Sequence, residues 1–177
     1  MLMVQNYVAL AENEGGATPA PEDVCAADMD EDVLRIMVAK QLGLTYLQPA
    51  VGPPEWPAGG LQGTLWGYQN RPFYKLQVAR GASSVWAPFF SDSRASQCFL
   101  NESTFRALGF TDNIPTGPNP GSVDIHGFRV HVWLARGHLE GVNVLGASFK
   151  QAAGAKETAD FSNGTLSMQC LFRSNLT

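Results

Sequence analysis

The sequence predicts a mainly β fold preceded by an N-terminal extension that contains one amphipathic helix. Two observations lead to this prediction. The chain of 177 residues contains 18 glycines and 11 prolines, which favour many short strands and turns over a bundle of helices. Apolar and polar residues alternate in several segments after about residue 65, whereas clear helical spacing occurs near the N-terminus. We therefore divide the chain into residues 1–60 and residues 65–177.

The N-terminal region is acidic. Residues 1–40 hold eight acidic and two basic residues, a net charge of −6, so the other 137 residues carry +2 of the total of −4. Residues 1–10 are apolar and are predicted to form a strand, and residues 12–22 are predicted to form a loop. Residues 49–60 are rich in proline and glycine, which predicts a linker or a surface crossing without regular structure.

One amphipathic helix is predicted between these segments. Asp30 or Asp32 can accept hydrogen bonds from the free amides of a first turn, and apolar residues recur at helical spacing from Leu34 onward. Gly43 is suited to end the helix. We expect the helix to span about residues 32–42.

The remaining sequence predicts strands and one further short helix. Apolar residues from Tyr74 to Val78 alternate with Lys75 and Gln77, which is typical of a strand with one buried face. Dipeptides that favour tight turns, His126-Gly127 and Asn163-Gly164, separate two pairs of alternating segments. The predicted strands are residues 73–79, 84–90, 123–125, 128–134, 157–161 and 165–171, and the predicted helix is residues 101–109.

Several classes of function are disfavoured by composition. Charged residues make up 16% of the chain, and lysine and arginine are not clustered, so we expect neither nucleic-acid binding nor a basic membrane-binding surface. No apolar stretch is long enough to span a membrane. Phosphate-binding glycine motifs are absent, and His126, His131 and His138 do not form a clear ligand set. We expect no cofactor and no metal.

The cysteines and the N-terminus favour an intracellular, cytoplasmic protein. Cys25, Cys98 and Cys170 are odd in number and widely spaced, and no basic segment followed by a long apolar core opens the sequence. The three Asn-x-Ser/Thr sequons are then interpreted as chance products of a chain rich in these residues.

Two segments, taken together, indicate a family. The predicted strand 84–90 runs into a polar loop, a short helix ending in Leu-Gly follows, and an apolar segment later stops at a glycine. The loop and the later segment are Asp92-Ser93-Arg94-Ala95-Ser96 and Val142-Asn143-Val144-Leu145-Gly146. This order resembles the retropepsin-like aspartic peptidases, the family of retroviral and retrotransposon proteases, over roughly residues 68–172.

The resemblance implies a closed β-barrel with one short helix and an active site shared by two chains. Asp92 would be the catalytic carboxylate, one from each chain of a homodimer, and Ser93 would brace the paired loops. Ala95 belongs to the same loop, and Asn143 and Gly146 would support it from behind. In such a site two carboxylates share one proton, and one of them activates a water molecule.

The sequence departs from the family pattern at two points. Arg94 stands where the family has glycine, and a guanidinium group there is expected to pair with Asp92 and disturb a shared proton. The 13 residues between Gly109 and Val123 leave little room for the hairpin that closes over a substrate. These departures favour a catalytically degenerate protein that acts as a dimerisation or peptide-binding module.

Three alternatives stay open at this point. The protein is an active homodimeric endopeptidase that uses one Asp92 per chain, or an adaptor whose acidic N-terminal helix binds a basic protein partner. The simplest alternative for Asp92-Ser93 is an ordinary polar turn, because both residue types favour local hydrogen bonding.

Overall fold

The computed structural model describes residues 29–110, 114–115 and 119–171, and these residues form a mainly β fold, as predicted. The strand and the loop predicted over residues 1–10 and 12–22 lie outside the described residues. None of the helices within the described ranges has the length and apolar character needed to cross a membrane.

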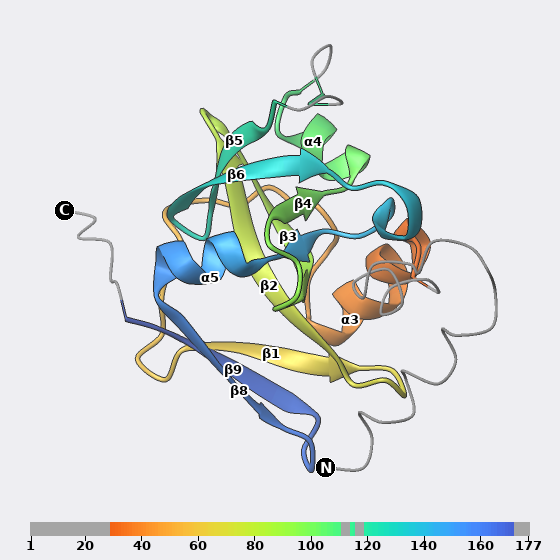
Figure 1. Cartoon of the computed structure of the whole chain (residues 1–177), viewed down its shortest axis with the longest axis vertical. Coiled ribbons are helices and arrows are strands. Elements are labelled where there is room, and N and C mark those ends of the chain that lie inside the picture. The colour runs from red at the N-terminus through yellow and green to blue at the C-terminus, as the bar shows by residue number, and fades with distance from the viewer. Residues whose placement is uncertain (1–28, 111–113, 116–118, 172–177) are drawn as a thin grey trace.

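Nine strands of the described residues belong to one sheet with the order β3-β7-β4-β6-β5-β2-β1-β9-β8. β2 also pairs with β3, so the pairing passes through six strands and returns to its start (Figure 1). The strands are β1 (Leu61–Trp66), β2 (Arg71–Arg80), β3 (Ser83–Ser91), β4 (Cys98–Leu100), β5 (Gly121–Ile125), β6 (Phe128–Leu134), β7 (Val144–Leu145), β8 (Ala155–Asp160) and β9 (Thr165–Cys170).

The predicted hairpins are present, and short strands join segments that are distant in sequence. β5 pairs with β6, and β8 pairs with β9, both antiparallel. β7 pairs with β3 in parallel and with β4 antiparallel, and β4 pairs with β6 in parallel. β7 lies within the apolar segment that was expected to stop at Gly146. β1 and β4 were not predicted, because their six and three residues show no regular alternation of apolar and polar side chains.

The helices are short. The predicted helix over about 32–42 corresponds to helical residues 31–41, but its middle is π-helical, so a regular α-helix is not confirmed. Asp30 Oδ1 accepts a hydrogen bond from the backbone N–H of Val33 at 2.8 Å, and Gly43 follows the helix with a φ of 63°. The helical segments are η1 (Val33–Val38), α3 (Ala39–Gln41), α4 (Glu102–Ala107), the 3₁₀ turn η2 (Gly137–Leu139) and α5 (Ala147–Ala153).

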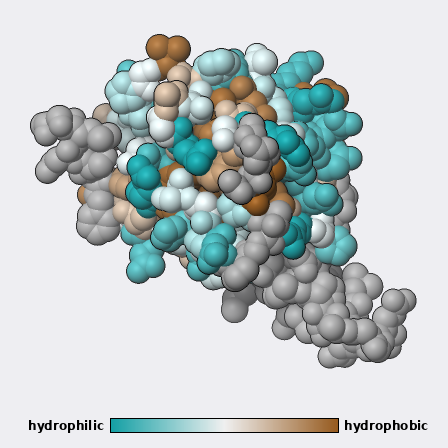
Figure 2. Space-filling view, turned by 90° about the horizontal axis from the view of Figure 1, so that it is seen from above, coloured by the Kyte–Doolittle hydropathy of each residue, from teal (hydrophilic) through white to brown (hydrophobic). Residues whose placement is uncertain are grey.

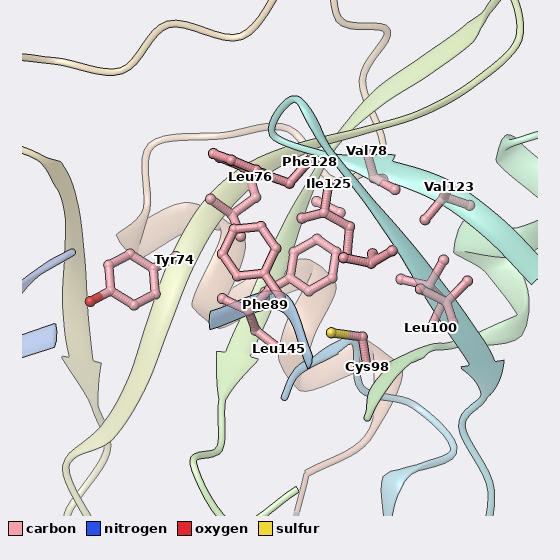
Figure 3. Close-up of a cluster of buried hydrophobic side chains, with 14 of the residues drawn as sticks. Tyr74, Leu76, Val78, Phe89, Cys98, Leu100, Val123, Ile125, Phe128 and Leu145 are labelled. Atoms are coloured by element: carbon pink, nitrogen blue, oxygen red, sulfur yellow. The ribbon is translucent and has the colours of Figure 1, made fainter. Parts of the chain in front are cut away.

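The main hydrophobic core lies inside the circuit of strands. Leu76, Phe89 and Ile125 come from three different strands and are fully buried, and their side chains converge in Figure 3. The predicted alternation holds for this face of β2.

On the opposite face of β2 Gln77 is also buried, contrary to the expectation of a half-buried strand. Its Nε2 donates to the carbonyl of Gly52 at 2.9 Å, so the segment predicted as a linker covers it.

His126 holds that covering segment in place. It lies in the β5–β6 turn with a φ of 47°, followed by Gly127 at 89°, as a two-residue turn with positive φ requires. Its Nδ1 accepts the backbone N–H of Gln77 at 3.3 Å, and its Nε2 is 3.0 Å from the carbonyl oxygen of Glu55. The indole of Trp56 donates to the His126 carbonyl at 3.1 Å. Both ring nitrogens of a neutral imidazole therefore take part in hydrogen bonds, one as acceptor and one as donor.

Acidification is predicted to destabilise the fold through His126. Burial lowers the pKa of His126 from its ordinary value of 6.5, because the charged imidazole is poorly solvated inside the protein. The unfolded chain then takes up a proton at a higher pH than the native chain, so stability falls as the pH drops below about 6.5. Thermal melts between about pH 8 and pH 5 should show a steeper loss for the wild type than for His126→Asn, which tolerates the same φ.

His131→Asn is the matched control, because it makes the same substitution at an exposed histidine. An unchanged slope in His126→Asn would contradict the assignment.

Candidate active site around Asp92

The structure brings together the two segments that the sequence singled out. Asp92 directly follows β3, and its backbone N–H donates to the Leu145 carbonyl at 3.2 Å. Two residues earlier the N–H of Phe90 donates to the Asn143 carbonyl at 2.8 Å. The parallel pairing of β3 with β7 therefore places residues 142–146 beside the Asp92 loop, although some fifty residues separate them.

The Asp92 carboxylate is buried, and only one of its two oxygens has a hydrogen-bonding partner among the described residues. Its side chain is 5% exposed, and Oδ1 accepts the backbone N–H of Arg94 at 2.9 Å. The Arg94 Nε lies 3.4 Å from the same oxygen. The other oxygen, Oδ2, is buried without a hydrogen-bonding partner among the described residues. A buried carboxylate oxygen without a partner is costly, so Oδ2 marks a position where a donor would be stabilising.

The other loop residues differ in exposure. Ser93 is exposed, and none of the hydrogen bonds given for the described residues involves its side chain. The Arg94 side chain is 44% exposed. Arg94 is not among the residues with positive φ, so the loop adopts its turn without glycine at this position. Ala95 is 1% exposed and anchors the loop in the interior.

Asn143 ties three segments together behind the loop. It is fully buried, its Oδ1 accepts the backbone N–H of Asn101 at 3.0 Å, and its Nδ2 donates to the Pro88 carbonyl at 3.3 Å. Asn101 in turn caps α4 by accepting the N–H of Thr104 at 2.9 Å. Asn101 is itself fully buried and belongs to one of the three Asn-x-Ser/Thr sequons, Asn101-Glu102-Ser103, so its asparagine has a structural role.

Gly146 allows the backbone of α5 to approach the loop. A Cβ atom at this position would lie 2.0 Å from the Gln97 carbonyl oxygen and 2.8 Å from that of Ala95. The close approach lets the N–H groups of Ala147 and Ser148 donate to the carbonyls of Ala95 and Ser96, at 2.8 and 3.1 Å. The first turn of α5 thus holds the far end of the Asp92 loop.

A polar network that the sequence analysis missed lies on the other side of Asp92. Ser91 Oγ donates to Glu157 Oε1 at 2.5 Å, and Lys150 Nζ donates to Glu157 Oε2 at 2.7 Å. The Tyr74 hydroxyl points away from the cluster in Figure 3 and is buried near Glu157, with no hydrogen bond of normal geometry among the described residues. Burial, together with the nearby negative charge of Glu157, raises the pKa of Tyr74. No sequence spacing connects these residues, since they come from β2, β3, α5 and β8.

A cavity of about 520 Å³ lies apart from Asp92, between the start of the N-terminal helix, α4 and the turn after η2. Figure 2 shows a face whose hydrophilic side chains surround a smaller hydrophobic area. Four acidic residues line the cavity together with Arg106 and His138, and these acidic residues are Asp30, Glu31, Glu102 and Glu140. Within the described residues no group of acidic, histidine and cysteine side chains is arranged to hold a metal ion.

The chain was compared with protein-family models, curated proteins and solved structures. No protein-family model matches the chain. No curated protein matches it either. A solved structure described as a retropepsin-like aspartic protease from Rickettsia conorii is similar over 64% of this chain and 94% of its own, with 15% identity and a TM-score of 0.45.

Replacing Gly146 with alanine is predicted to destabilise the fold by roughly 1–3 kcal/mol, because the added methyl group collides with backbone rather than with a flexible side chain. Chemical denaturation followed by tryptophan fluorescence measures the loss. Gly59→Ala is the matched control, since a Cβ at Gly59 meets nothing within 4 Å. Equal midpoints for the two variants would show that the loop does not depend on this contact.

Proposed function

We propose that this protein is a catalytically degenerate member of the retropepsin-like aspartic peptidase fold that binds peptides as a homodimer. Support for the fold comes from the order and the contact of its motifs. An apolar strand ends in Asp92-Ser93, a strand containing Val144 pairs alongside it, and a helix begins directly after Gly146. The closed circuit of strand pairs agrees with a barrel.

The contact between Arg94 and Asp92 carries the proposal of degeneracy. Two N–H groups of Arg94 point at Oδ1 of Asp92, so this oxygen is engaged before any second carboxylate or water approaches. An arginine side chain keeps its positive charge at every relevant pH. Two aspartates that share one proton must approach each other closely. In a dimer each chain brings one Arg94, and its guanidinium group beside the carboxylate opposes that approach.

The unpartnered Oδ2 of Asp92 favours a second candidate, the active homodimeric endopeptidase. Oδ2 has no donor among the described residues, and a proton shared with the Asp92 of another chain would supply one once the atoms that cover Oδ2 move aside. In that case Arg94 would orient the carboxylate rather than block it. The adaptor hypothesis, in which the acidic N-terminal helix binds a basic partner, stays a prediction from the sequence.

Removal of the Arg94 side chain separates the two candidates. We expect the wild type to leave an unfolded protein substrate intact between about pH 4 and pH 6, where a carboxylate pair holds one proton. Arg94→Gly should cleave it, because the guanidinium contact with Oδ1 is removed while the backbone N–H of residue 94 remains. The double variant Arg94→Gly/Asp92→Asn should return cleavage to background. Product peptides are quantified by mass spectrometry.

Arg129→Ala serves as the control, because this exposed arginine pairs with Asp124 instead of Asp92. Cleavage by the wild type that Asp92→Asn abolishes would establish the second candidate. If Arg94→Gly stays inactive, Arg94 is not what disables the site.

A homodimer is expected in solution for either candidate, because one chain supplies a single Asp92 loop. Sedimentation equilibrium at micromolar concentration should give a mass near twice the 19.1 kDa of the chain. A monomer over this concentration range would contradict both candidates.

A further inference from the structure

One strand of the described sheet has a free edge. The members of the strand circuit have at least two neighbours each, and β1 lies between β2 and β9. β8 pairs with β9 alone. In Figure 1 the hairpin of β8 and β9 lies on the side of the molecule opposite α4. The outer edge of β8 therefore has no strand partner among the described residues, and such an edge can pair with the strand of another chain.

The free edge carries a row of polar side chains. Lys156, Thr158 and Asp160 share one face of β8, because they are two residues apart, and all three are exposed. The Lys156 ammonium makes no hydrogen bond or ion pair within the described residues. Asp160 Oδ2 accepts one hydrogen bond there, from Asn163 Nδ2 at 2.6 Å, and an ionised carboxylate oxygen can accept two. A positive and a negative side chain, each with room for a further partner, thus lie on either side of Thr158.

The opposite face of β8 carries a single charged residue. Glu157 lies there between the small side chains of Ala155 and Ala159. Its carboxylate is engaged by Lys150 Nζ at 2.7 Å and by Ser91 Oγ at 2.5 Å. A strand that approaches the edge therefore meets a carboxylate whose charge is already paired.

A second copy of β8 fits this edge in one antiparallel register. A two-fold axis perpendicular to the sheet keeps opposite residues on the same face, so the axis passes through a residue and its own copy. An axis through Glu157 or Lys156 would bring two like charges opposite each other, which destabilises a strand pair. An axis through Ala159 would leave only residues 158–160 of the strand to pair. An axis through Thr158 places Lys156 opposite Asp160 of the second copy, twice by symmetry, and opposite charges at such positions are stabilising.

The same axis lies close to the contact that leads to Asp92. Glu157 precedes Thr158 in β8, and its carboxylate accepts the hydrogen bond from Ser91, the residue before Asp92. Two chains joined through β8 would therefore have their Asp92 loops connected to one interface by these side-chain contacts. This agrees with a function that needs the Asp92 loops of two chains.

We propose that two copies of this chain associate through their β8 strands, antiparallel and centred on Thr158, with Lys156 of each copy paired to Asp160 of the other. The proposal rests on the homodimer of the proposed function and adds the surface through which it forms. The two sheets then become one continuous sheet, and the free edge of β8 is covered by backbone hydrogen bonds.

A cysteine on the axis tests the register. Thr158→Cys places two thiols directly opposite each other, where the Cβ atoms of a strand pair are about 4.5–5.5 Å apart and a disulfide needs only a small adjustment. The full-length chain also carries Cys25→Ser and Cys170→Ser, whereas Cys98 is buried and is kept. We expect oxidised glutathione to convert most of this variant into a covalent dimer on a non-reducing gel.

Gln169→Cys in the same background is the matched control. Gln169 is exposed and lies on β9 directly opposite Lys156, so the same face of the hairpin carries the thiol while β8 stays intact. In the proposed pair three strand spacings, about 14 Å, separate its two copies. This variant should stay monomeric on the gel.

A charge reversal tests the ion pairs independently. Lys156→Glu places a carboxylate opposite each Asp160, and we expect the dimer dissociation constant from sedimentation equilibrium at low salt to rise at least about tenfold. Lys40→Glu makes the same change of net charge at an exposed lysine of α3 and should leave the dissociation constant unchanged.

The outcomes separate this interface from the proposed function. A dimer in solution that Thr158→Cys does not cross-link would overturn the β8 interface and leave the homodimer standing. Equal cross-linking of Thr158→Cys and Gln169→Cys, or equal effects of the two charge reversals, would also overturn it. A cross-linked Thr158→Cys dimer that binds no peptide and cleaves nothing after Arg94→Gly would contradict the proposed function alone. A monomer would contradict both.

Discussion

The pairing of β3 with β7 is the contact on which the rest of the structure depends. Through it the backbone of Phe90 and Asp92 meets Asn143 and Leu145 in a parallel ladder. β7 is only two residues long, so the pairing needs support from side chains. Asn143 supplies it by bridging the backbone of Asn101 and Pro88 in a fully buried position, where a lost partner would leave polar groups unsatisfied. The strand circuit and the position of Asp92 follow from this junction.

Three elements converge on the Asp92 loop from different sides. The first turn of α5 holds its far end, which requires the close approach that Gly146 permits. The network of Ser91, Glu157 and Lys150 connects the strand before Asp92 to the C-terminal hairpin. The N-terminal helix buries the apolar face beside it. These three elements hold the loop while Oδ2 of Asp92 has no partner among the described residues and Oδ1 accepts the N–H of Arg94, the local hydrogen bond of a polar turn.

Much of the fold was predictable where the local pattern is strong. The alternation in β2 and β6, the turn at His126-Gly127 and the helix that begins at Glu102 agree with their sequence signals within a few residues. Prediction failed where the cause is not local. The burial of Gln77 depends on the distant segment at Gly52, a contact that periodicity does not contain. The π-helical middle of residues 31–41 has no explanation in the local sequence pattern.

The sequence by itself determined a mainly β chain with an acidic N-terminal region, and it singled out Asp92, Arg94, Asn143 and Gly146 by residue type and order. Tertiary structure alone decided that Arg94 reaches Oδ1 of Asp92, that Oδ2 has no partner among the described residues, and that an N-terminal helix packs against the apolar side chains beside the loop. The physical reason is that residue patterns encode local conformation and burial, whereas a distance between two side chains depends on how the whole sheet closes. Around Asp92 the closure of the sheet depends on the two residues of β7 and on the buried Asn143.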